Sequence, residues 1–102
     1  MTFDESSLAA IAAELDITFA VEPYAVRGAR VYGSTMRSRD GGSLRIILWP
    51  SIGRIDIRVG MLAITLKDVK RVDIYPGVEV TFRRKGGGFL FVTRSGQVTM
   101  AV

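Results

Sequence analysis

Apolar residues change their spacing once along the chain, from the period of a helix to the period of a strand, and this change restricts the fold most. The first spacing is the i, i+3, i+4, i+7 pattern of one helix face, formed by Leu8, Ile11, Ala12 and Leu15. From Asp16 onward, apolar and polar residues alternate in short segments separated by turn residues. The sequence therefore predicts one amphipathic helix over about residues 3–15 and a β body over about residues 17–102.

The residues at the start of this helix carry a capping signal. Thr2 and Glu5 have the spacing of a capping box, in which each side chain accepts a hydrogen bond from a free backbone N–H. Asp4 and Glu5 also suit the positive end of the helix dipole. Because a helix of about 12 residues is marginal alone, we expect it to pack on the β body.

The β body is expected to contain about eight short strands. The clearest alternation places Ile55, Ile57 and Val59 on one face and charged residues on the other. We expect the first strand to end at Pro23, and glycine-containing turns to separate later strands. Those turns are Asp40-Gly41-Gly42-Ser43, Pro76-Gly77, Lys85-Gly86-Gly87-Gly88 and Ser95-Gly96.

The predicted fold is mainly β, or α+β if its single helix is counted, in one domain over residues 1–102. The connections are too short for the crossovers that parallel strands require, so the strands should be antiparallel. Regularly spaced antiparallel strands form either a small barrel or a two-sheet sandwich. Both architectures remain open at this point.

Residues Leu66 to Gly96 resemble pleckstrin-homology-like and related small bacterial domains. The similarity lies in the order of a strand around Lys67-Asp68-Val69-Lys70-Arg71-Val72, a turn and a glycine-tipped hairpin. It implies a PH-like barrel. Those domains end in a helix that covers the barrel, whereas the helix predicted here comes first, and the resemblance assigns no functional residues.

The composition excludes several kinds of chemistry. The chain has no cysteine, which excludes disulfides, thiolate zinc sites and cysteine nucleophiles, and no histidine, which removes the commonest general base and metal ligand. Asp56 lies between Arg54 and Arg58 and is interpreted as a partner in surface ion pairs. We therefore expect no catalytic residues, no metal and no cofactor, and hence no enzyme.

Charge is distributed unevenly along the sequence. Residues 1–22 contain five acidic residues and no basic ones, so residues 23–102 hold all 14 basic residues against five acids, a balance of +9. One interpretation is an acidic helix held on a basic body by complementary charge. The alternative is a surface that binds nucleic acid or another polyanion, with Arg54, Arg58, Arg83, Arg84 and Lys85 as candidates.

Aromatic residues bear on the same alternative. The tyrosines and Trp49 would supply stacking surfaces for single-stranded nucleic acid. The phenylalanines mostly fall on the apolar sides of their strands, so we expect them in the core.

Protein binding is the function that the sequence favours. Residues 46–49 are apolar on both faces of their strand, so either the helix covers the second face or part of it is exposed for a partner. The contact candidates are Ile47, Trp49 and, on a C-terminal edge strand, Met100. The alternative for Trp49 is a core position under the helix. We expect a protein-interaction or self-assembly module, and hence a homo-oligomer.

The sequence also bears on location. No apolar stretch approaches the roughly 18 residues that a membrane-spanning helix needs. The N-terminal residues are acidic, whereas a secretory signal begins with basic residues. We therefore expect a cytoplasmic protein without a membrane partner.

Overall fold

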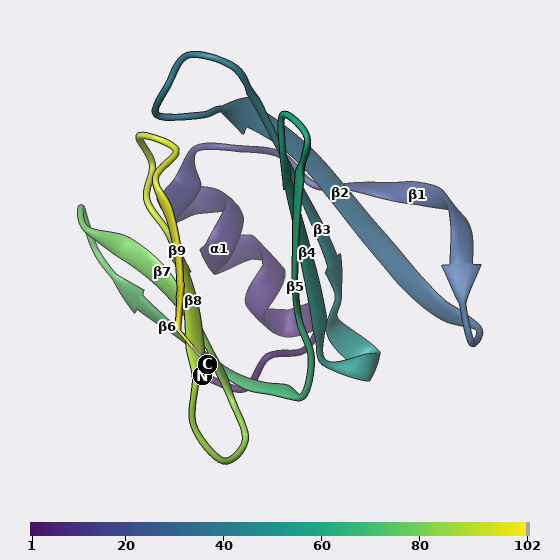
Figure 1. The fold of residues 1–102 in the computed structure, drawn as a ribbon. Helices are drawn as coiled ribbons and strands as arrows, with labels where there is room; N and C mark the ends of the chain where they lie inside the picture. The colour runs from purple at the N-terminus through teal and green to yellow at the C-terminus, as the bar shows by residue number, and fades with distance from the viewer. Residues whose placement is uncertain (102) are drawn as a thin grey trace.

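The computed structural model describes residues 1–101, which form nine antiparallel strands in two sheets and one α-helix (Figure 1). The first sheet has the order β1 to β5, and its strands are Ala20–Val26, Ala29–Arg37, Ser43–Trp49, Arg54–Val59 and Leu62–Leu66. The second sheet has the order β6 to β9, and its strands are Val69–Tyr75, Glu79–Arg84, Phe89–Val92 and Val98–Ala101. Every strand pairs only with its neighbours in the sequence.

The mainly β prediction is confirmed, and the two predicted architectures can now be separated. Within residues 1–101 no strand pairs across the two sheets, so they do not close into a barrel. A two-sheet sandwich fits this arrangement, whereas the barrel, including the PH-like barrel, does not. The structure has nine strands where about eight were expected.

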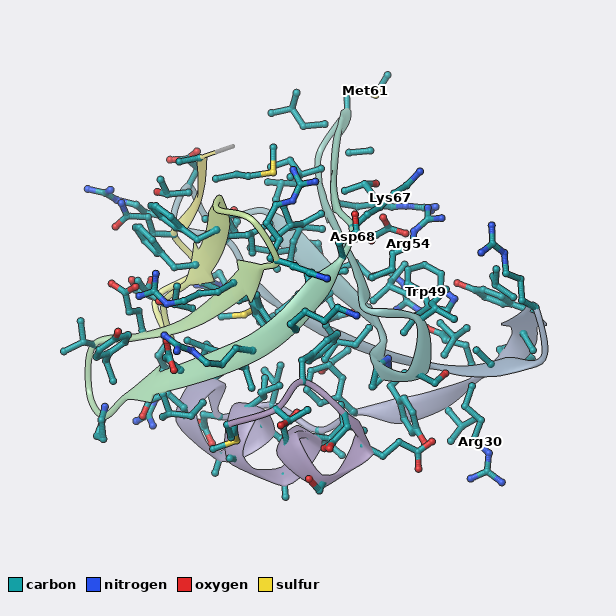
Figure 2. All side chains as sticks on the ribbon, turned by 90° about the horizontal axis from the view of Figure 1, so that it is seen from below. Arg30, Trp49, Arg54, Met61, Lys67 and Asp68 are labelled. Atoms are coloured by element: carbon teal, nitrogen blue, oxygen red, sulfur yellow. The ribbon has the colours of Figure 1, made fainter. Side chains whose placement is uncertain are left out.

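The main core lies between the two sheets and is closed on one side by the helix α1 (Leu8–Leu15), as Figures 1 and 2 show. Ile11 and Leu15 are fully buried in this core, and Leu8 packs at its margin. The predicted apolar stripe is therefore confirmed for Leu8, Ile11 and Leu15, whereas Ala12 is only half-buried. A short 3₁₀ turn, η1 (Glu5–Ser7), leads into the helix.

The helix starts differently from the prediction. Asp4, not Thr2, makes the side-chain capping bond: its carboxylate accepts a hydrogen bond from the backbone N–H of Ser6 at 2.9 Å and so caps η1, whereas Ser7, just before α1, makes no such bond. Thr2 instead forms an isolated bridge with Arg71 in β6. The capping box was wrong because the residues before the helix pair with a strand that the local sequence could not reveal.

The first strand also differs from its predicted bounds. It begins at Ala20 and continues through Pro23. Proline is tolerated here because β1 is an edge strand and its pairing with β2 is irregular between Val21 and Ala25. Ile17 and Phe19 precede the strand and pack against the core.

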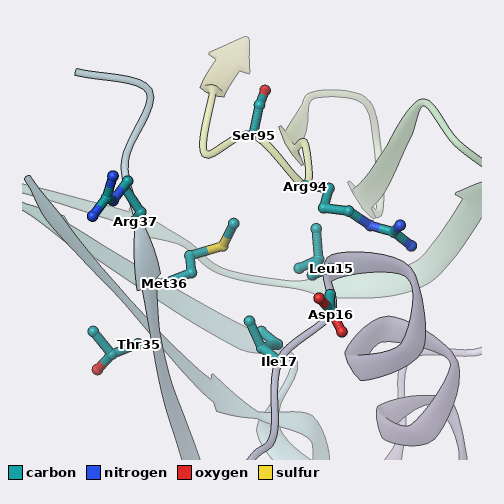
Figure 3. Close-up of a pocket in the computed structure, with 8 residues that line it drawn as sticks. All are labelled: Leu15, Asp16, Ile17, Thr35, Met36, Arg37, Arg94 and Ser95. Carbon is teal, nitrogen blue, oxygen red and sulfur yellow. The ribbon is translucent and has the colours of Figure 1, made fainter. Parts of the chain in front are cut away.

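Two contacts from the basic body hold the helix C-terminus, and neither is an ion pair between side chains. Arg94 donates a hydrogen bond through Nε to the backbone carbonyl of Glu14 at 2.8 Å, and Figure 3 shows its side chain beside the end of α1. The Glu14 carboxylate accepts hydrogen bonds from the backbone N–H of Gly77 at 3.1 and 3.3 Å. A cation at a helix C-terminus also suits the helix dipole. The helix is thus anchored through backbone groups.

The two sheets meet at two corners where backbone approaches backbone. At one corner, the N–H of Val69 donates to the carbonyl of Gly53 at 2.8 Å. At the other, the N–H of Arg39 donates to the carbonyl of Gly96 at 3.0 Å. Both glycines have positive φ, and a Cβ at either would lie within 2.8 Å of the facing backbone. Glycine is needed at both corners for conformation and for space.

Among residues 1–101, no helix has the length and apolar character needed to cross a membrane.

Candidate binding surface

Two of the four sheet edges are protected against pairing with another chain. On β1, Pro23 and an irregular register interrupt the free edge. On β6, the edge carries Lys70 and Arg71 and is covered by residues 1–3. The N–H of Phe3 donates to the carbonyl of Lys70 at 3.0 Å. The N–H of Val72 donates to the carbonyl of Met1, and the amino group of Met1 donates to the carbonyl of Val72.

The other two edges, β5 and β9, lack these protections. Neither strand contains a charged residue or a proline, and their pairing with β4 and β8 is regular. Natural edge strands usually carry such protection, because their free N–H and C=O groups otherwise pair with another strand. Met61, in the turn before β5, and Leu62, the first residue of β5, are exposed apolar residues.

Both unprotected edges border the same groove. The groove has a volume of about 530 Å³ and is lined from β5 by Leu62 and Ile64 and from the second sheet by Val98. It lies on the side of the sandwich opposite α1, where Figure 1 shows β5 and β9 in front of the helix. We call this region the β5–β9 groove. The sequence suggested an exposed β9 edge but not β5, because an edge is defined by strand order.

The predicted contact residues fall in different places. Met100 is 38% exposed and lies opposite Leu90 on the inner face of β9. Ile47 and Trp49 are only 2% and 4% exposed. They pack with Val31 in a small second cluster, on the face of β3 opposite the main core. Hence Trp49 is neither on an exposed patch nor under the helix, and Ile47 and Trp49 offer almost no accessible surface to a partner.

The structure brings the predicted polyanion-binding residues together only in part. Arg54 and Arg58 lie on the outer face of the first sheet, whereas Arg83 lies on the outer face of the second. Lys85 follows β7 in the hairpin tip. Arg84 lies 3.8 Å from Asp68, and its Nε is buried without a hydrogen-bond partner.

Several of these arginines are also paired with acids. Arg54 lies 3.2 Å from Asp56, so the predicted ion pair forms with Arg54. It is not a pair on a solvated surface, because Asp56 is buried and also accepts a hydrogen bond from the Thr65 hydroxyl. Arg83 donates through Nε to Asp73 at 2.6 Å. The five residues therefore form no single patch, although Arg54 and Arg84 both lie near Asp68.

The Asp73 carboxylate is the centre of a small charged network on the second sheet. The hydrogen bond from Arg83 holds the pKa of Asp73 below its usual value, and Arg71, at 3.0 Å, acts in the same direction. Since the pKa is depressed in the folded state, the stabilisation is present above the unfolded pKa of about 4 and disappears as the pH falls through the folded value.

We expect Asp73→Asn to be less stable than the wild type by about 1 kcal/mol at pH 7, because the network is partly exposed. This difference should shrink as the pH falls from about 4, where the carboxylate of the unfolded chain binds a proton, through the lower pKa of the folded state. Urea unfolding at a series of pH values measures the difference. A difference that stays constant down to pH 2 would contradict the role assigned to the carboxylate.

The phenylalanines divide between two environments. Phe3 and Phe82 meet edge to face in the main core, with ring centres 5.7 Å apart. Phe89 and Phe91 stack on each other on the outer face of β8, with ring centres 6.2 Å apart. The core assignment was therefore wrong for this pair. Their strand is apolar on both faces, so alternation could not assign a side.

Within residues 1–101 no group of three or more histidine, cysteine, aspartate or glutamate residues could hold a metal ion.

Comparisons with known proteins add no relative. No family model, curated protein or solved structure matches the chain.

Proposed function

We propose that this protein is a non-catalytic self-association module, in which the free edges of β5 and β9 pair with a second copy of the chain. The supporting observation is the contrast between the edges: β1 and β6 are protected, whereas the two uncharged edges border the same groove. The lack of histidine and cysteine in the sequence supports a binding role over a catalytic one.

A second copy suits these edges for two reasons. An antiparallel pair of identical strands forms a two-fold symmetric interface, the commonest symmetry of soluble oligomers. Because β5 and β9 carry no charge, such pairing places no like charges opposite each other, which would destabilise it. Burial of Met61, Leu62 and Met100 in the contact would add hydrophobic stabilisation.

Sedimentation velocity over a range of protein concentrations tests this proposal. We expect the wild type to form dimers. Leu62→Lys and Met100→Lys should each weaken the dimer about 100-fold or more, because an edge lysine must be desolvated and faces another lysine across the two-fold axis.

The matched control is Val78→Lys. Val78 is 60% exposed, close to the 68% of Leu62, and lies in the turn between β6 and β7, away from the groove. This variant should dimerise like the wild type. A monomeric wild type at all concentrations, or groove variants that associate as well as Val78→Lys, would reject the proposal. Circular dichroism shows whether each variant is folded.

A further inference from the structure

A small hollow at one end of the first sheet brings together basic residues from three separate segments. Its volume is about 170 Å³. Arg27 comes from the turn between β1 and β2, Arg54 from the start of β4, and Lys67 from the link between β5 and β6. Val26, Ile52 and Asp68 complete the lining. None of these residues lines the β5–β9 groove.

Arg54 is held in place before any ligand binds. Its guanidinium carbon lies 4.8 Å from the centre of the Trp49 ring, and its Nη2 lies 3.2 Å from the Asp56 carboxylate. Stacking on an indole ring and pairing with a carboxylate both restrict an arginine side chain. Figure 2 shows Trp49, Arg54, Lys67 and Asp68 in the same part of the molecule. A fixed guanidinium loses little conformational freedom when it binds an anion.

The other two cations are available for a ligand. Within residues 1–101, neither Arg27 nor Lys67 forms an ion pair. The acidic residue at the rim, Asp68, is mostly exposed and lies 3.8 Å from Arg84. Arg84 adds a fourth positive charge to those of Arg27, Arg54 and Lys67. Two carboxylates, those of Asp56 and Asp68, oppose them, so the region keeps a positive balance.

The backbone at this hollow is also unusual. Arg27 and Asp68 have φ values of 53° and 59°, in the left-handed region that residues other than glycine rarely adopt. They are two of the three such non-glycine residues within 1–101. Strained backbone of this kind concentrates at ligand sites, where the surrounding structure holds it.

We propose that this hollow binds the phosphate group of a ligand through Arg27, Arg54 and Lys67. A tetrahedral oxyanion accepts charge-assisted hydrogen bonds from several cations at once, and the planar guanidinium group matches two of its oxygens. Val26 and Ile52 add no polar group to the lining, so the three cations face the ligand with Asp68 as the one acidic side chain of the lining. This site is independent of the self-association proposal, because the two surfaces share no residue.

The single tryptophan of the chain gives a direct signal for the test. Because Arg54 lies over Trp49, an anion that binds Arg54 should alter the tryptophan fluorescence. The probe is inorganic phosphate at pH 7, titrated against sodium chloride of equal ionic strength. O-phosphoserine forms a second arm, which shows whether a covalently attached phosphate group binds as the free ion does. We expect a saturable change with phosphate and none with chloride.

Charge-removing variants locate the site. Arg27→Gln and Lys67→Gln should each weaken phosphate binding about tenfold or more, since each removes one charge-assisted contact. Arg58→Gln is the matched control, because Arg58 is exposed on the same sheet but does not line the hollow. It should bind like the wild type. An equal response to chloride, no saturable binding of either phosphate compound, or equal weakening by Arg58→Gln would overturn the proposal.

Discussion

Replacement of Gly96 by alanine is expected to lower the free energy of unfolding by about 3 to 5 kcal/mol, through backbone strain and steric overlap together. Gly96 has φ of 86°, and a Cβ there would lie 2.8 Å from Cα of Ser38 and closer still to the carbonyl oxygen of Arg37. The carbonyl that this Cβ would overlap belongs to Arg37, at the end of β2 in the first sheet. The corner between the sheets must therefore open, and the hydrogen bond from Arg39 to Gly96 should be lost.

Gly41→Ala separates the two causes. Gly41 has φ of 92°, almost the same as Gly96, but a Cβ there meets nothing within 4 Å. This variant should lose only about 1 kcal/mol, the cost of the left-handed conformation alone. Urea unfolding of both variants measures the difference. Equal losses would contradict the close approach of the sheets at Gly96.

Phe82→Ala is expected to lower the free energy of unfolding by about 3 to 5 kcal/mol. Phe82 is fully buried between the sheets and meets the ring of Phe3 edge to face. Removal of the ring loses its burial, leaves a cavity and removes this aromatic contact. The effect should be large because Phe3 would lose its contact with the Phe82 ring, and this contact helps to hold residues 1–3 along the β6 edge.

The matched control for this substitution is Phe91→Ala. Phe91 is in the neighbouring strand β8 but on the outer face of the sheet, where it stacks on Phe89. We expect a loss of about 1 kcal/mol, since solvent can occupy the space that the ring leaves. Thermal or urea unfolding compares the two variants. A greater loss for Phe91→Ala than for Phe82→Ala would reverse the assignment of inner and outer faces.

Local patterns predicted those parts of the fold that depend on local sequence. The i, i+3, i+4, i+7 spacing located the helix and its buried face, because only one stripe of a helix can face a core. Strict alternation located β4, and both Pro76-Gly77 and Ser95-Gly96 lie between strands with glycine at positive φ. These features require no knowledge of which strand lies beside which.

The errors arose where tertiary arrangement decides. Ile46 to Trp49 is apolar on both faces, and the second face is covered by a small cluster with Val31 instead of by the helix. Likewise, Pro23 is accepted within a strand only because that strand is at an edge. Local alternation cannot give strand order.

The same limit applies to the two candidate sites. The uncharged sequence of β5 was visible, but its position at an edge beside the same groove as β9 was not. The hollow collects Arg27, Arg54 and Lys67 from segments well separated in sequence. The sequence grouped Arg54 instead with Arg83, which lies on the other sheet. Charge balance indicated a basic surface without showing where its residues meet.

Amide hydrogen exchange at low and high protein concentration tests self-association through the β5–β9 groove, because strand pairing protects the amides of the strands that pair. We expect protection to increase with concentration in β5 and β9, while β1 and the covered β6 edge remain unchanged. Protection that does not change with concentration in β5 and β9, or that increases only in β1 or β6, would contradict self-association through the β5–β9 groove.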